Sequence, residues 1–175
     1  MTMTSLSKPL PDEHIPYYST YIGLVQGDVF EFMAHTHATL HALIKDLSDA
    51  HASARPAPTE WSIKEIIGHL SDGERLFSYR ALRFARNDVT PLASFDPDPY
   101  VLAGNFNART LPDIWAEFDA VHAASVALFR SFDEEALLRR GVASGNIISV
   151  RALLYITAGH EQHHLISIRD VYLSE

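Results

Sequence analysis

The sequence predicts an all-α protein folded as a four-helix bundle. Of its 175 residues, 47% are apolar and 21% are charged, which are ordinary values for a globular domain. Four long segments repeat apolar residues at the three-and-four spacing of an amphipathic helix, and no segment has a convincing strand pattern. Such helices bury their apolar stripes against one another. We expect residues 1–15 to form an N-terminal tail and residues 16–175 to form one bundle domain.

The N-terminal segment is expected to lead into the first long helix. Residues 1–27 are rich in Pro, Ser and Tyr and predict a tail followed by an irregular strap, whose tyrosines indicate partial packing on the body. Asp28 and Glu31 match the capping-box pattern and predict that the helix begins there. The expected buried face of this helix consists of Phe30, Met33, Leu40, Ile44 and Leu47.

A clearer capping box predicts the second helix, and a long loop is expected after it. Ser62 is the N-cap, Glu65 follows three residues later, and the helix is expected to run to about Asn87. Residues 88–109 contain three prolines and predict a long loop. The aromatic residues of this loop favour an ordered cover over one end of the body.

The remaining two helices follow in the last third of the chain. Thr110 is the expected N-cap of a third helix that reaches Phe129. A short helical turn at residues 133–139 and a turn at residues 141–146 come next, and the last helix begins at Ser149. We find no internal repeat and expect no second domain.

Charge and composition exclude several classes of partner. The net charge is −8 without any Lys/Arg cluster, so we expect no nucleic-acid partner. Arg80, Arg83 and Arg86 are candidates for binding an anionic group, although a solvated helix face is the favoured interpretation. No apolar run reaches the roughly 18 residues of a membrane helix, and residues 1–14 lack a leader pattern, so we expect a cytoplasmic protein. Because the chain has no cysteine, nitrogen and oxygen must hold any metal.

Two histidines interrupt the apolar stripe of the last helix. His160 and His164 lie one helical turn apart, where the stripe should be buried. Burying an imidazole costs free energy unless its nitrogens have partners, and one metal ion can bind both rings. The i, i+4 spacing brings the side chains about 5–6 Å apart, close enough to share an ion. A buried pair of hydrogen-bonded histidines is the alternative, which spacing alone does not exclude.

The second helix offers further candidates. A catalytic site of the zinc type has three protein ligands and an open position, and His69 at the edge of the stripe can supply the third. Gly73 indicates the close approach of another group, because a mid-helix glycine costs about 1 kcal/mol relative to alanine. Glu74 lies at the centre of the stripe. It either pairs with Arg80 or Arg151, or accepts a hydrogen bond from a ligand imidazole or acts as a general base.

His37 also faces inward, among the apolar residues of the first helix. A core histidine with a hydrogen-bond partner is the leading interpretation, followed by lining of the pocket and then by metal ligation. His41 follows the same logic more weakly. The remaining histidines are interpreted as surface or incidental: His14, His35, His51, His122 and His163.

Several motifs are spread along the chain in a characteristic combination. They are Trp61-Ser62-Ile63-Lys64-Glu65, Gly68-His69-Leu70 with Glu74, Phe95-Asp96-Pro97-Asp98-Pro99-Tyr100, Asn107-Ala108-Arg109 and Gly159-His160-Glu161-Gln162-His163-His164. Together they resemble the DinB/YfiT-like superfamily of metal-dependent enzymes, over residues 16–173. The resemblance implies an up-down-down-up bundle, a homodimer, and one divalent ion, nickel or zinc, held by His69, His160 and His164.

The resemblance and the ligand set lead to three hypotheses about function. A divalent ion on neutral imidazoles keeps its full charge, so it can lower the pKa of bound water to about 7 or hold a thiol as thiolate. Because some members of the superfamily use small thiols, the leading hypothesis is a thiol-dependent S-transferase acting on small electrophilic molecules. The second is a metal-dependent small-molecule hydrolase, which a base such as Glu74 would favour. The third is a non-catalytic metal- or ligand-binding protein, with His37 as a fourth ligand.

The predicted loop supplies one more candidate for the site. Under the leading hypothesis residues 95–109 cover the metal, and Arg109 either orients an anionic group of the substrate or pairs with a surface carboxylate.

Overall fold

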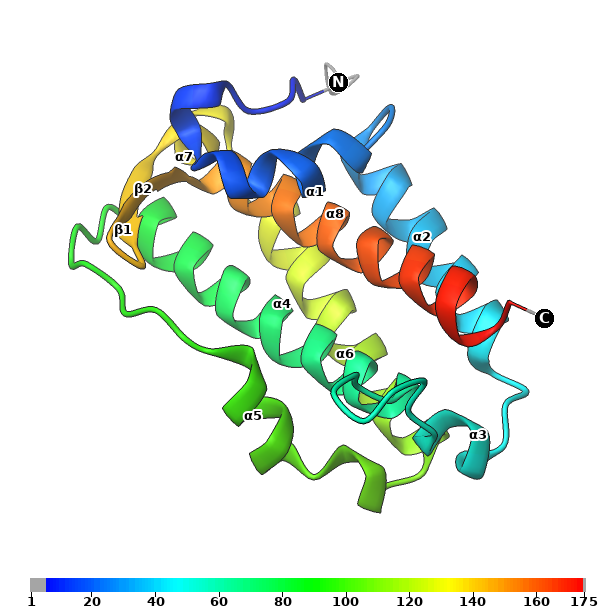
Figure 1. The fold of residues 1–175 in the computed structure, drawn as a ribbon. Coiled ribbons are helices and arrows are strands. Elements are labelled where there is room, and N and C mark those ends of the chain that lie inside the picture. The colour runs from blue at the N-terminus through cyan, green and yellow to red at the C-terminus, as the bar shows by residue number, and fades with distance from the viewer. Residues whose placement is uncertain (1–5, 175) are drawn as a thin grey trace.

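The computed structural model describes residues 6–174, in which four long helices pack as a bundle (Figure 1). Helices α2 and α8 run in one direction, and α4 and α6 run in the opposite direction (Figure 1). This is the predicted up-down-down-up arrangement, and the predicted fold class is confirmed. The bundle helices are α2 (Val29–Ile44), α4 (Ile63–Ala85), α6 (Leu111–Arg130) and α8 (Val150–Ser167).

The predicted helix starts are confirmed by their side-chain caps. Asp28 Oδ1 accepts hydrogen bonds from the backbone N–H groups of Phe30 and Glu31. Ser62 and Glu65 form the reciprocal capping box, in which each side chain satisfies the other's backbone N–H. Each cap removes unsatisfied donors from the first helical turn and thereby fixes where the helix begins.

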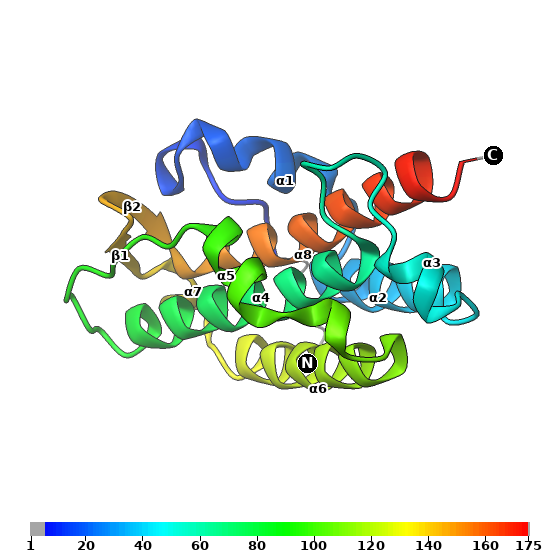
Figure 2. The ribbon, with the colours of Figure 1, turned by 60° about the horizontal axis from the view of Figure 1, so that its bottom comes forward.

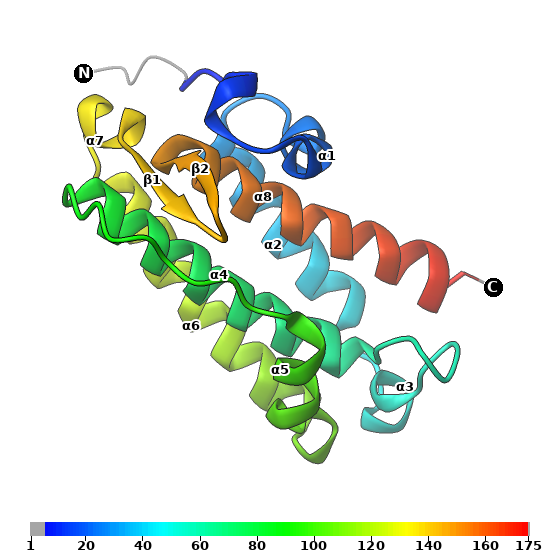
Figure 3. The same cartoon turned by 60° about the vertical axis from the view of Figure 1, so that its left-hand side comes forward.

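Short elements connect and extend the bundle. Helix α7 follows α6, and a two-stranded antiparallel hairpin lies between α7 and α8 (Figure 3). The helical turns are α1 (Ser19–Leu24), α3 (Asp49–Ser53), α5 (Pro97–Gly104), α7 (Glu134–Leu138), the 3₁₀ turns at Pro11–Glu13, Pro16–Tyr18 and Phe106–Ala108, and a π-helical turn at Ile168–Tyr172; the strands are β1 (Arg140–Ala143) and β2 (Asn146–Ser149). No helix in the described residues has both the length and the apolar character needed to cross a membrane.

The hairpin corrects the expectation that the chain contains no strand. Ser144 and Gly145 both have positive φ, 53° and 75°, as a two-residue type I′ turn requires. The predicted turn at residues 141–146 is therefore present, but it joins two four-residue strands. Strands this short carry too few alternating positions to be distinguished from a loop in the sequence.

Helix α5 corrects part of the predicted loop at residues 88–109. Asp96 caps this helix through the backbone N–H of Asp98, and Pro97 occupies its first turn. Proline is well tolerated at the start of a helix because its missing N–H has no intrahelical partner there. Pro97, one of the three prolines that predicted a loop, therefore begins a helix, which lies along α4 (Figure 2).

The N-terminal segment packs on α8. Residues 1–5 of the predicted tail lie outside the described residues, and Glu13, within the tail, is only 2% exposed. The strap that follows is partly helical and docks closely: a Cβ on Gly159 of α8 would lie 2.0 Å from the backbone oxygen of Tyr21. Only a glycine permits this contact between α1 and α8.

Candidate metal centre

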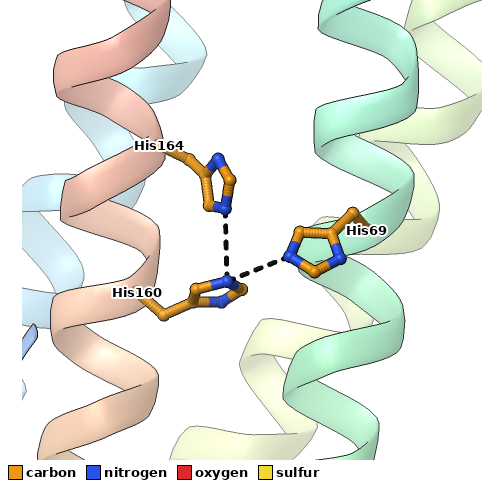
Figure 4. A group of neighbouring side chains, drawn as sticks. All are labelled: His69, His160 and His164. Carbon is orange, nitrogen blue, oxygen red and sulfur yellow. Dashed lines mark hydrogen bonds between the residues drawn. The ribbon is translucent and has the colours of Figure 1, made fainter. Parts of the chain in front are cut away.

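Three histidines from two helices converge on one point (Figure 4). His69 projects from α4, and His160 and His164 project from successive turns of α8. The Nε2 atom of His160 lies 3.0 Å from Nε2 of His69 and 3.2 Å from Nε2 of His164. The ligand atoms of all three rings lie within 4.8 Å of one another. The structure thus brings together the three residues that the sequence predicted as metal ligands.

Burial keeps these imidazoles neutral. It lowers the pKa of His69 to about 4, and it holds the pKa values of His160 and His164 well below their usual range. Neighbouring histidines lower the pKa values of His160 and His164 further, because each would repel a second positive charge. At neutral pH the three rings are therefore uncharged, and each has one nitrogen lone pair that a metal ion could bind.

The hydrogen-bond geometry of the cluster fits a metal ion better than a network of protons. A neutral imidazole Nε2 offers either one N–H or one lone pair. His160 Nε2 faces two other Nε2 atoms and can satisfy only one of them by a hydrogen bond. A divalent transition metal accepts all three lone pairs at once, and imidazole is a common ligand of nickel and zinc.

The missing side chain of Gly73 leaves room for the ring of His160. A Cβ on Gly73 would lie 3.3 Å from Cε1 of His160, which is tighter than an ordinary contact. The close approach predicted from this mid-helix glycine is therefore confirmed.

The substitution Gly73→Ala separates metal binding from stability. We expect the metal-free protein to change by less than about 1 kcal/mol in its free energy of unfolding, since alanine favours the helix while the contact opposes it. We expect zinc affinity to fall by about 10-fold, because the ring must move by a few tenths of an ångström. Gly23→Ala in α1, which meets nothing within 4 Å, is the control, measured by calorimetric titration and chemical unfolding. Unchanged zinc affinity in Gly73→Ala would show that His160 tolerates the shift.

A pocket of about 300 Å³ opens onto the three histidines. Aromatic side chains, counting the histidines, form most of its wall, and the ring of Tyr21 lies edge-on to His160 with the centroids 5.4 Å apart. The strap contributes its three tyrosines to the wall, and the segment expected to form an ordered cover contributes Phe95 and Pro97. The other lining residues are Tyr17, Tyr18, Trp61, Phe77, Arg80, Phe95, Pro97, Ser144 and His163.

Arg80 places a positive charge in this wall. Its guanidinium donates hydrogen bonds to the backbone oxygen of Ala93 and to Ser144 Oγ, at 2.9 and 3.2 Å, and lies over the ring of Phe95. The side chain is buried, so the interpretation of Arg80 as part of a solvated helix face is wrong. Its burial could have been predicted from the sequence, because Arg80 lies three residues after Phe77 and four before Phe84 on the apolar stripe.

Arg109 and His37, two candidate pocket residues, make their contacts outside the pocket wall. Arg109 forms ion pairs with Asp113, at 2.6 Å, and with Glu117, at 2.5 Å, which is the alternative role considered for it. His37 does not line the pocket, and its two ring nitrogens contact Glu161 and Asp119.

Glu74 and His122 contact each other inside the bundle. The Glu74 carboxylate lies 3.4 Å from His122 Nδ1, so Glu74 pairs with neither Arg80 nor Arg151. His122 is 6% exposed, which corrects its interpretation as a surface or incidental residue. The sequence signal for its burial was the spacing of four from Phe118 and seven from Phe129 on α6. Glu74 is not among the residues that line the pocket.

Fold and site together define a four-helix-bundle protein with a three-histidine pocket suited to a divalent metal. The model of the DinB superfamily matches residues 33–168, and the chain belongs to this superfamily. This confirms the resemblance stated from the sequence motifs.

Two solved structures share the fold at low sequence identity. YfiT from Bacillus subtilis, described as a probable metal-dependent hydrolase with an unusual four-helix bundle topology, is 15% identical over 94% of this chain and 91% of its own, with a TM-score of 0.75. A mycothiol-dependent maleylpyruvate isomerase is 10% identical over 87% of this chain and 66% of its own, with a TM-score of 0.69. No curated protein gives a significant match.

Proposed function

We propose that the protein is a metal-dependent thiol S-transferase acting on small electrophilic molecules. In this proposal His69, His160 and His164 hold one nickel or zinc ion, and the pocket receives both the thiol and the electrophile. The cytoplasm as location and a homodimeric assembly remain predictions from the sequence and the family.

We favour a thiol over water as the nucleophile because no carboxylate is found among the described residues that line the pocket. The described residues that line the pocket include no Asp or Glu. Activating water for hydrolysis usually relies on a general base within hydrogen-bond reach, and Glu74, the expected base, contacts His122 instead. A thiol depends less on such a base, because its pKa of about 8.5 starts far below that of water and a bound divalent metal would hold it as thiolate at neutral pH.

The residues around the histidines suit an anionic thiol and a planar or apolar electrophile. Arg80 offers a fixed positive charge for a carboxylate of the thiol. Trp61 and Phe95 provide apolar surface that excludes water from the reacting atoms. The thiolate sulfur attacks the electrophilic carbon, a C–S bond forms, and the displaced group leaves with the electron pair.

A thiol-conjugation assay tests this proposal. Protein reconstituted with Ni²⁺ or Zn²⁺ is incubated with mycothiol, bacillithiol or glutathione and an aryl halide, and the conjugate is measured by mass spectrometry. We expect turnover that requires the metal. Arg80→Gln is expected to raise KM about 10-fold for bacillithiol and glutathione, which carry carboxylates, but not for mycothiol or 2-mercaptoethanol, which carry none. Arg86→Gln, an exposed arginine at the end of α4, is the control.

A metal-dependent hydrolase is the second candidate. His163 is exposed at the pocket and its ring lies 5.3 Å from that of Tyr21, so it offers an imidazole that could accept a proton. Release of product from esters or amides without any thiol would favour this candidate, and loss of that activity in His163→Ala would identify the base. The absence of turnover with every thiol and every hydrolysable substrate would instead support a non-catalytic role.

A further inference from the structure

Arg80 is a buried cation that has no carboxylate beside it. Two other basic side chains are buried in the described part of the chain, and both are paired: Lys64 with Asp49, at 3.0 Å, and Arg151 with Glu13. Arg80 is 4% exposed and forms no ion pair with any described residue. Because an unpaired charge is costly to bury, the pocket wall contains a positive charge whose counter-charge the described chain does not supply.

The guanidinium of Arg80 is held in a fixed position by two neutral oxygens. They belong to Ala93, in the segment after α4, and to Ser144, in the hairpin turn beside the C-terminal end of α4 (Figure 3). The two segments also hold each other, because Leu92 N–H donates to the Val142 oxygen at 2.9 Å and Ser144 N–H donates to the Leu92 oxygen at 3.0 Å. A guanidinium has five N–H donors, so further donors are left for a ligand.

Arg80 and His69 lie on the same face of α4. Arg80 comes eleven positions after His69, and in an α-helix this spacing corresponds to three turns plus about 20°. Both residues line the pocket, and so does Phe77 between them, whose ring centroid lies 5.8 Å from that of His160. The pocket therefore extends along α4, with the three histidines at one end and Arg80 at the other.

The rise of the helix sets the distance between the two ends. The ring of His160 lies against Gly73, seven positions before Arg80, which corresponds to about 10 Å along the helix axis. An extended peptide covers at most about 3.6 Å per residue, so this distance is about three residues long. A ligand with its thiol and its carboxylate on one residue, such as free cysteine, is too short to reach both ends.

We propose that the Arg80 end of the pocket is an anion subsite, and that the thiol substrate is an elongated molecule with a carboxylate about 10 Å from its sulfur. The sulfur end of this assignment rests on the proposed function, whereas the anion subsite rests on Arg80 and its surroundings. The carboxylate accepts charge-assisted hydrogen bonds from the guanidinium and supplies its missing counter-charge. Tyr18 and Phe95, which also line the pocket, provide apolar surface for the stem of the ligand.

Pairs of thiols of different length test the proposal, with binding to the Zn²⁺-loaded protein measured by calorimetric titration. Mercaptoacetate is compared with 2-mercaptoethanol, and 8-mercaptooctanoate with 8-mercapto-1-octanol, so that the members of each pair differ in their charge. We expect the carboxylate to strengthen binding about 10-fold in the long pair and to have no effect in the short pair. An equal gain at both lengths, or no gain in the long pair, would overturn the proposal.

Two variants test whether Arg80 is the origin of this gain. Arg80→Gln should abolish it, whereas Arg86→Gln, which replaces an exposed arginine at the end of α4, should keep it. Ser144→Gly removes one oxygen that positions the guanidinium, and the φ of 53° at this position suits glycine. It should reduce the gain without lowering Tm. A full gain in Arg80→Gln would show that the carboxylate binds elsewhere.

Octanoate separates this proposal from the proposed function, because it has the carboxylate but no sulfur. We expect the metal-free protein to bind octanoate about 10-fold more tightly than 1-octanol, and Arg80→Gln to lose this preference. If this holds while no thiol is conjugated, the transferase proposal fails and the anion subsite stands. Metal-dependent conjugation of neutral thiols, with no preference for octanoate or for 8-mercaptooctanoate, would support the transferase and overturn the subsite.

Discussion

Replacing His160 by alanine is expected to lower the affinity of the pocket for zinc or nickel by more than about 100-fold. Loss of a partner that only orients a ligand already costs about 10- to 100-fold, and His160 is the central ring of the three. Its Nε2 is the atom that both His69 and His164 approach, at 3.0 and 3.2 Å. Without it only two candidate ligand rings remain.

Calorimetric titration with Zn²⁺ and the conjugation assay check this expectation together. The pocket ion should be lost, and thiol conjugation should fall to the uncatalysed rate. His35→Ala removes an exposed histidine from α2 and should leave both measurements unchanged. Unaltered affinity and stoichiometry in His160→Ala would show that the convergence of the three rings is a packing arrangement and not a metal centre.

Replacing Glu13 by glutamine is expected to destabilise the protein by about 3–5 kcal/mol, because it leaves Arg151 buried without its counter-charge. The Glu13 carboxylate accepts hydrogen bonds from Arg151, from Ser149 Oγ at 2.6 Å and from the backbone N–H of Leu10 at 3.0 Å. Chemical unfolding at neutral pH measures the difference. Glu135→Gln breaks an exposed pair with Arg139 and should cost less than about 1 kcal/mol.

The destabilisation should depend on pH in a defined direction. Burial alone would raise the pKa of Glu13, but hydrogen bonds from Arg151 and Ser149 outweigh it and hold the pKa below its usual value of 4.5. The stabilisation is therefore complete above about pH 4.5 and is lost as the pH falls through the lower pKa of the folded state. The difference between wild type and Glu13→Gln should shrink on acidification. A difference that stays constant down to acid unfolding would contradict this ion pair.

Removing both charges tests whether the ion pair of Glu13 with Arg151 itself contributes to stability. Glu13→Gln/Arg151→Met removes both charges, so it should recover most of the loss seen in the single variant. A double variant as unstable as Glu13→Gln would mean that the N-terminal segment is held by Glu13 through its other contacts, such as that with Ser149.

The parts of the fold that repeat over many residues were predictable from the sequence. Helix α4 has a capping box at Ser62 and a stripe that continues for six turns, and both were visible. The hairpin and α5 were not, because their formation depends on a two-residue turn at Ser144 and Gly145 and on one proline that begins a helix. Such short elements are determined by packing on the bundle more than by their own pattern.

The candidate site, too, was predictable only in part from the sequence. Spacing predicted that His160 and His164 share a face and made His69, at the edge of the stripe of the second helix, the candidate third ligand; the resemblance implied the same three residues. Spacing could not predict that His37 and His122 stack on each other across the bundle, because this depends on how α2 and α6 are rotated about their axes. Glu74 was recognised as unusual from its place on the stripe, but its partner could be found only in three dimensions.

The contact of Gly159 with the backbone of Tyr21 has a consequence for how the protein matures during synthesis. One wall of the pocket comes from residues near position 20, while two of the three candidate metal ligands lie beyond position 159. A ribosome must therefore have released the chain at least to His164 before the strap can dock and the pocket can close. Under the proposed function, metal binding at the complete pocket would follow the end of synthesis.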